Sequence, residues 1–203
     1  MEIPMTWLRT GIVALGLTLL GGCASGPERT GIATSFPNDE LQIYVEEDVA
    51  YLSGVLDRDL PGRLKAMIAD HPNVTDLVLV DVPGSVDQNA TMASAQLIRR
   101  LGLNTHIAKT GYVLSGGVDL FLGGKKRTIG AGAGVGVHSW RSVEEWGSDV
   151  NLADPVHAAY VNFYLAMGVP ERFYWFTLEA APPERVYFLS PEEIYEYRLV
   201  TPR

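Results

Sequence analysis

The chain has 203 residues, with 24 acidic and 16 basic side chains and a formal net charge of −8. This acidic balance, without a cluster of basic residues, argues against nucleic acid as a partner. Hydrophobic residues make up 47% of the chain, which is enough for a packed core, and the length suits a single folded domain.

The N-terminal residues have the pattern of a secretory signal. Arg9 precedes an uncharged apolar run over residues 11–20, and small residues lead from that run to Cys23. A helix that spans a membrane needs roughly 20 apolar residues, so this shorter run is not expected to remain in a bilayer. We therefore predict that residues 1–22 form a signal peptide that is removed.

Leu20-Gly21-Gly22-Cys23 resembles the lipobox of bacterial lipoproteins, in which the cysteine thiol receives diacylglycerol. The resemblance implies a lipid on Cys23, and several acyl chains on one residue hold a membrane stably. Ala24 follows, which in Gram-negative lipoproteins implies the outer membrane, so we expect a cell-envelope protein facing the periplasm. The alternative is an ordinary signal peptide with a chance cysteine, which would leave a reactive thiol because the chain has no second cysteine.

The remaining chain divides into a tether and a domain. Residues 23–40 begin with the lipidated cysteine and are rich in glycine, serine, threonine and proline, which predicts a flexible tether. Residues 41–203 are predicted to form one α/β domain, because strand patterns alternate with helix patterns as in folds with a mainly parallel sheet. The expected strands are Leu41–Val45, Val49–Val55, Leu77–Val82, Thr105–Ala108, Thr128–Ile129, Gly130–Gly136, Val186–Leu189 and Leu199–Val200. The expected helices are Arg58–Asp70, Met92–Leu101, Pro155–Met167 and Pro170–Leu178, with further helices beginning at Ser115 and after Ser190.

Four histidines are present, and His138 is the best candidate for a general base. It ends a glycine-rich strand, where the backbone can approach other groups closely. We expect His71 in a solvated loop, His106 at the start of a strand, and His157 packed on a helix.

Ser115 is the matching candidate nucleophile, because Gly116 and Gly117 follow it at the start of a helix-like segment. A serine there can present its hydroxyl while nearby backbone N–H groups face a developing oxyanion. Val113 stands where the Gly-x-Ser-x-Gly elbow of α/β-hydrolases has glycine, so that elbow is disfavoured. The local sequence alone favours a helix N-cap for Ser115.

Four blocks in matching order resemble the Clp protease proteolytic subunit and crotonase superfamily, and above all its small exported members. The blocks are Val78–Ser85, Gly111–Gly117, Gly136–Ser139 and Phe188–Val200, and the resemblance covers about residues 49–200. It implies a spiral of ββα units with a mainly parallel sheet.

The resemblance also assigns a site. It makes Ser115 the nucleophile and His138 its general base, and backbone N–H groups of Gly84 or Ser85 and of Gly116 the oxyanion hole. Ser85 stands in place of the second glycine of the family's Ser-Pro-Gly-Gly turn, and a side chain there restricts the backbone angles.

The third catalytic residue departs from the family pattern. Val186 holds the place of the family's acid, while Glu184 lies two residues earlier on the same side of a strand. Glu184 is therefore the candidate acid, and Asp149 and Asp154 are alternatives. A Ser-His dyad without an acid also stays open.

These observations predict a membrane-anchored serine hydrolase, in particular a peptidase of peptide or protein substrates, with no metal and no cofactor. An alternative is a catalytically inactive member that binds peptides or cell-envelope partners. Another is a Ser-Lys hydrolase with Lys109 as base. The acyl-CoA-binding branch of the superfamily lacks the Ser-His pair, so CoA chemistry is not expected. Clp-type relatives assemble into rings or trimers, so the resemblance also allows a homo-oligomer.

Overall fold

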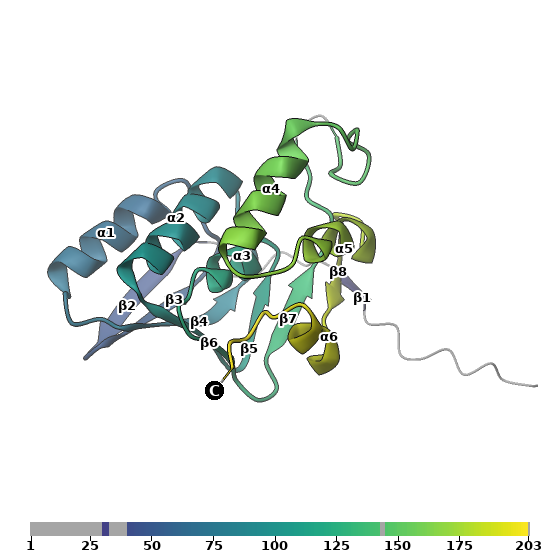
Figure 1. Ribbon diagram of the computed structural model, residues 1–203. Helices are drawn as coiled ribbons and strands as arrows, with labels where there is room; N and C mark the ends of the chain where they lie inside the picture. Colours follow the sequence, from purple (N-terminus) through teal and green to yellow (C-terminus); the bar gives the residue numbers. More distant parts are fainter. Residues whose placement is uncertain (1–29, 33–39, 143–144, 203) are drawn as a thin grey trace, which may run out of the picture.

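A single eight-stranded sheet forms the centre of the molecule, and helices pack against it (Figure 1). The computed structural model describes residues 30–32, 40–142 and 145–202. The strands are β1 (Thr30–Ile32), β2 (Gln42–Glu46), β3 (Val49–Ser53), β4 (Asp76–Val82), β5 (Asn104–Leu114), β6 (Arg127–Ile129), β7 (Gly134–Val137) and β8 (Arg185–Phe188). The helices are α1 (Leu60–Asp70), α2 (Gln88–Leu101), α3 (Gly116–Leu122), α4 (Pro155–Ala166), α5 (Arg172–Ala180) and α6 (Pro191–Glu196).

The sheet has a parallel centre and antiparallel edges, which confirms the α/β class expected from the sequence. Its strand order is β1-β8-β7-β5-β4-β3-β2, and β6 pairs with β5 off this path. The pairs β3–β4, β4–β5, β5–β6 and β5–β7 are parallel, whereas β2–β3, β7–β8 and β1–β8 are antiparallel.

Strand β4 is buried mainly on the face toward the helices. Its run of apolar residues predicts burial on both faces, yet only Leu77, Leu79 and Val82 are fully buried, while Val78 and Val80 are half-buried. Helices α1 and α2 pack side by side against one face of these strands, and the alternation of a strand turns every second residue to the other face (Figure 1).

Helix α2 begins earlier than the sequence pattern predicts. Asp87 caps it, because the carboxylate accepts a hydrogen bond of 2.9 Å from the amide of Ala90. Gly102 ends it in the left-handed conformation, with φ of 74°, which glycine adopts without strain. The helix therefore starts at Gln88, close to the Gly84–Ser85 turn.

Strand β5 is longer than expected and leads directly into Ser115. Its register against β4 shifts between Leu79 and Asp81, and Gly111 passes so close to the carbonyl of Val80 that a side chain would not fit. Beyond this irregularity the strand continues to Leu114 and pairs with β7. The pairing of β4 and β5 that positions Ser115 therefore depends on glycine at position 111.

The strand predicted at Leu199–Val200 is wrong. Leu199 is fully buried, and its carbonyl accepts a hydrogen bond of 2.7 Å from Nε of Arg127. The Arg127 guanidinium, itself buried, also donates to the carbonyls of Leu122, Gly124, Met167 and Arg198. Burial lowers the pKa of Arg127 to about 10. The Arg127 side chain therefore holds this segment in place of a strand ladder. The prediction failed because a short apolar run does not by itself distinguish a strand from an irregular buried segment.

The predicted signal peptide and the lipid site at Cys23 lie outside the described residues. Within the predicted tether, Thr30–Ile32 form β1 and pair antiparallel with β8. Among the described ranges, no helix has the length and apolar character needed to span a membrane.

Candidate functional site

Ser115 occupies a strained position between β5 and α3. Its backbone has φ of 52° and ψ of −126°, a region that non-glycine residues adopt at a cost of about 1–3 kcal/mol. The Ser115 amide donates to the carbonyl of Gly136 at 2.9 Å, which holds the residue in place. Ser115 stands at the N-cap position, but its side chain makes no capping hydrogen bond, and its Oγ has no hydrogen-bond partner among the described residues.

Three backbone amides belong to segments that pack beside Ser115. Gly84, with φ of 146°, lies so close that a Cβ on it would be 3.4 Å from Cβ of Ser115. A Cβ on Gly116 would meet the Ser85 side chain at 2.7 Å, so the turn packs on the start of α3. In the described part of the chain, the amides of Gly84, Ser85 and Gly116 have no hydrogen-bond acceptor. Such free donors beside a nucleophile are what an oxyanion hole requires.

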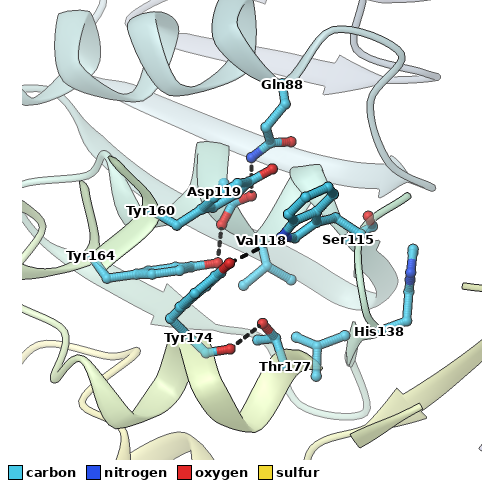
Figure 2. Close-up of a pocket in the computed structure, with 11 residues that line it drawn as sticks. Gln88, Ser115, Val118, Asp119, His138, Tyr160, Tyr164, Tyr174 and Thr177 are labelled. Carbon is cyan, nitrogen blue, oxygen red and sulfur yellow. Dashed lines mark hydrogen bonds between the residues drawn. The ribbon is translucent and has the colours of Figure 1, made fainter. Parts of the chain in front are cut away.

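His138 follows β7 and is held in one tautomer by the backbone. Its Nδ1 lies 2.7 Å from the carbonyl oxygen of Ser139. A carbonyl only accepts hydrogen bonds, so Nδ1 carries the proton and, in the neutral ring, Nε2 offers its lone pair. No hydrogen bond joins His138 to Ser115 within the described residues, although both side chains lie on the same side of one pocket (Figure 2).

The two side chains share an open groove and a small cavity below it. The outer groove has a volume of about 550 Å³ and is lined by Ser85, Val86, Gln88, Ser115, His138, Trp140, Arg141, Tyr160, Pro183 and Glu184. The inner cavity has a volume of about 30 Å³ and is lined by Gln88, Ser115, Val118, Asp119, Val137, His138, Trp140, Tyr160, Tyr164, Tyr174 and Thr177 (Figure 2). Ser115 and His138 line both the groove and the cavity.

None of the carboxylates considered as a third residue is hydrogen-bonded to the His138 imidazole within the described residues. Glu184 lines the outer groove, but no carboxylate in the described ranges is hydrogen-bonded to His138. Asp154 caps α4 through the amide of Val156, and Asp149 contacts Ser148. Lys109 is exposed on β5 and does not line the groove. Glu184 as the acid stays a prediction.

Asp119 is a site residue that the sequence analysis missed. It lies on α3 with 6% of its surface exposed and accepts hydrogen bonds from Nε2 of Gln88 at 2.6 Å and from the hydroxyl of Tyr164 at 2.7 Å. Burial raises its pKa to about 6, against the opposing effect of these two hydrogen bonds. The sequence feature that could have identified Asp119 is a single carboxylate within an apolar run, one helical turn after Ser115.

The other histidines lie away from the groove. His157 is a buried residue in the first turn of α4, and its Nδ1 lies 2.6 Å from the hydroxyl of Tyr174, as expected of a packed histidine. His71 is exposed at the end of α1.

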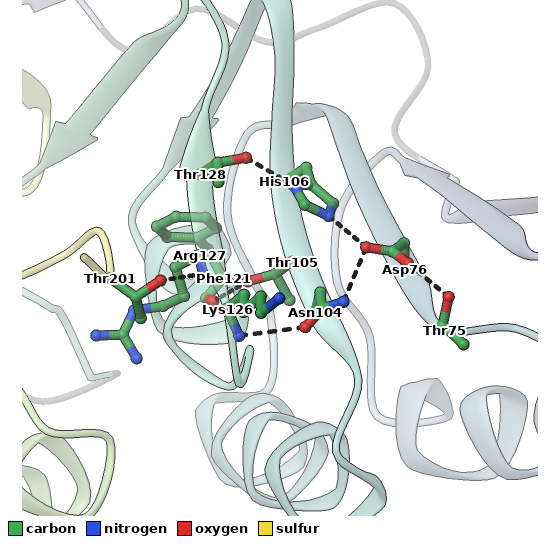
Figure 3. A network of polar contacts seen from close by, with 10 residues as sticks. All are labelled: Thr75, Asp76, Asn104, Thr105, His106, Phe121, Lys126, Arg127, Thr128 and Thr201. Carbon is green, nitrogen blue, oxygen red and sulfur yellow. Dashed lines mark hydrogen bonds and ion pairs between the residues drawn. The ribbon is translucent and has the colours of Figure 1, made fainter. Parts of the chain in front are cut away.

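His106 lies in β5, near its start, within a polar network on the sheet (Figure 3). Its Nδ1 is 2.6 Å from the Thr128 hydroxyl, and its Nε2 is 2.6 Å from a carboxylate oxygen of Asp76. Thr75 and Asn104 donate to the same carboxylate. Neither His106 nor Asp76 lines the outer groove or the inner cavity.

Comparisons with known proteins support the fold and give no family. No family model matches the sequence. No curated protein matches it either. Among solved structures, an enoyl-CoA hydratase of Geobacillus kaustophilus has a TM-score of 0.51 at 14% identity, over 82% of this chain and 68% of the other. The Pseudomonas aeruginosa protein PA4980 has a TM-score of 0.50 at 18% identity, over 82% and 77%.

A mutant of the 1510-N membrane-bound stomatin-specific protease, in complex with a substrate peptide, has a TM-score of 0.47 at 16% identity, over 77% of this chain and 75% of the other. At sequence identities this low, structural similarity gives information on the fold and none on the function. The α/β fold with a mainly parallel sheet predicted from the sequence is confirmed, and it is similar to the fold of that enoyl-CoA hydratase.

Proposed function

We propose that this protein is a serine hydrolase that cleaves peptide bonds, with Ser115 as nucleophile and His138 as general base. The observation that carries the proposal is the free Oγ of Ser115, on a strained backbone at the meeting point of a groove and three amides without acceptors. Strain of this kind persists where the surrounding structure enforces it, often at functional sites.

In the proposed reaction, Nε2 of His138 removes the Ser115 hydroxyl proton as Oγ attacks the substrate carbonyl. The developing oxyanion accepts hydrogen bonds from the amides of Gly84 or Ser85 and of Gly116. His138 then gives the proton to the leaving amine, and an acyl-enzyme remains. Water, deprotonated by the same imidazole, hydrolyses the ester. Loss of one oxyanion donor lowers turnover by about 10²–10³ in comparable sites.

The Ser139 carbonyl takes over one task of a catalytic carboxylate. It fixes the tautomer of His138, as the buried carboxylate does in a Ser-His-Asp triad. A neutral carbonyl stabilises an imidazolium less than a carboxylate does, so turnover is expected to be slow. Glu184, on the rim of the same groove, is proposed as the acid that supports His138 when substrate is bound.

A second candidate function is peptide binding without cleavage. It is favoured by the lack of a hydrogen bond between Ser115 and His138 in the described chain. Catalytic hydrogen bonds are often long in unliganded sites and tighten on binding, so this geometry is compatible with an enzyme. Reactivity of Ser115 separates the two functions.

The decisive experiment is labelling of the full-length chain, in detergent, with a fluorophosphonate probe. The wild type is expected to label, whereas Ser115→Ala is not, with folding checked by circular dichroism. Failure of the folded wild type to label would contradict the hydrolase and leave the binding function.

We also propose that the chain is anchored to the outer membrane through lipid on Cys23, and that it forms a homo-oligomer. The lipobox pattern supports the anchor. Metabolic labelling with an alkyne fatty acid in a bacterial host should modify the wild type and spare Cys23→Ser. Labelling that survives in Cys23→Ser would contradict the anchor. Sedimentation in detergent measures the oligomeric state.

A further inference from the structure

The inner cavity contains a carboxylate that no cation of the described chain neutralises. Asp119 accepts hydrogen bonds only from two neutral groups, the amide of Gln88 and the hydroxyl of Tyr164, and forms no ion pair there. A carboxylate has about four acceptor positions, so two remain for another donor. Buried charges are normally paired, because an isolated one is costly.

This cavity opens toward the nucleophile. Gln88, Ser115, His138, Trp140 and Tyr160 line both the inner cavity and the outer groove. A substrate side chain next to the attacked carbonyl can therefore reach the inner cavity when the carbonyl approaches Ser115. The cavity is placed to select that side chain.

The walls of the cavity suit a cation with an apolar stem. Trp140 stacks on Tyr160 with ring centroids 5.7 Å apart, and Tyr160 stacks on Tyr174 at 5.1 Å. The Tyr160 hydroxyl has no hydrogen-bond partner in the described residues, so it can accept from a bound donor. Val118 and Val137 provide contacts for methylene groups.

The size of the cavity narrows the choice. Its volume of about 30 Å³ is small, which favours a slender stem that ends in a compact ammonium over a planar guanidinium or an aromatic ring. We propose that the inner cavity is a specificity site for a lysine side chain on the acyl side of the bond that Ser115 attacks. This proposal rests on the proposed hydrolase function.

The test uses two peptidyl diphenyl phosphonate probes that differ only in the residue that enters the cavity. One carries lysine, and the other carries norleucine, which has a similar stem without the ammonium. On the full-length wild type in detergent, the lysine probe should label Ser115 at least about 10-fold faster, the factor expected of about 1.4 kcal/mol. In Asp119→Asn the two rates should become similar.

Two controls make each outcome decisive. Asp76→Asn removes a carboxylate distant from the groove and should keep the lysine preference. A small fluorophosphonate measures Ser115 reactivity in every variant. If this reagent labels the wild type but lysine is not preferred, or Asp119→Asn keeps the preference, the lysine site is refuted and the hydrolase stands. If the reagent fails on the folded wild type, both proposals fall.

Discussion

Two pairs of a hydroxyl and an imidazole lie near opposite ends of the same strand, β5. Near its start, Thr128, His106 and Asp76 form a continuous chain with two contacts of 2.6 Å (Figure 3). Past its end, Ser115 and His138 share no hydrogen bond in the described chain. Only the second pair has a groove, free amides and a strained serine. The Ser115 pair therefore has the space and the donors that a reacting carbonyl needs, whereas the His106 pair has only the chain of hydrogen bonds.

The carboxylates of the two regions also differ. For Asp76, partial burial acts to raise the pKa, but hydrogen bonds from Thr75, His106 and Asn104 outweigh it and lower the pKa below its ordinary value. For Asp119, deeper burial outweighs two hydrogen bonds and raises the pKa to about 6. Burial decides the sign, since both carboxylates have short hydrogen bonds.

The largest expected effect separates the two hydroxyls. Ser115→Ala should lower fluorophosphonate labelling by at least about 10³-fold, because the only proposed nucleophile is removed. Thr128→Ala should label like the wild type. Equal loss in both variants would mean that labelling depends on the fold of the sheet and not on the Ser115 hydroxyl.

Removal of the two imidazoles should change the rate of fluorophosphonate labelling by nearly as different amounts. His138→Ala should slow labelling by about 10²–10⁴, the range that a general base contributes. His106→Ala should leave the rate unchanged, since its ring faces a network outside the groove. Rates are measured by time-resolved gel fluorescence. A slow His106→Ala variant with normal melting temperature would overturn the assignment of the base.

The two carboxylates should give opposite dependences of stability on pH. Between the unfolded pKa of Asp119, about 4, and its folded pKa of about 6, the native state binds more protons. Stability from this group therefore falls as the pH rises from 4 to 6, by about 3 kcal/mol in total. Asp119→Asn should lack this fall, as measured by urea unfolding at a series of pH values.

Asp76 provides the matched control. Its pKa is lowered, so its contribution is present above about pH 4 and is lost as the pH falls through the lower folded pKa. Asp76→Asn should therefore cost about 1 kcal/mol or less at neutral pH, and the difference should shrink only in acid. If the stability difference between the wild type and Asp119→Asn also shrank only in acid, the raised pKa of Asp119 would be contradicted.

The smallest effect concerns the backbone. Glycine adopts the Ser115 conformation without strain, so Ser115→Gly should be about 1 kcal/mol more stable than Ser115→Ala, although neither labels. Thr128 lies in a regular strand, where Thr128→Gly should destabilise by about 0.5–1 kcal/mol. Urea unfolding of the three variants tests the signs. A less stable Ser115→Gly would show that Ser115 is not strained.

The elements of the sequence that carry their own local signal were predicted well. The hairpin β2–β3, the helix α1 and the capped helix α6 follow from alternation, helical spacing and the Ser-Pro-Glu-Glu cap. Ser115 and His138 were assigned from ordered sequence blocks, and the structure brings them to one groove. Their roles remain predictions that labelling tests.

What the sequence could not provide depends on contacts between distant segments. Asp119 meets Gln88, 31 residues away, and Tyr164, 45 residues away, and neither partner has a local signature. The length of β5 was underestimated because Gly111 interrupts its pattern, yet its pairing with β7 continues it to Leu114. Such features are set by tertiary packing, which overrides local preference.

Arg127 links the C-terminal segment to α3, the helix that follows Ser115. One guanidinium joins Leu122 and Gly124, where α3 ends, to Arg198 and Leu199. The same helix begins beside Ser115. If Ser115 reacts as proposed, cleavage of the chain near position 198 is expected to remove these contacts at the end of α3 and to lower Ser115 reactivity without changing the groove itself.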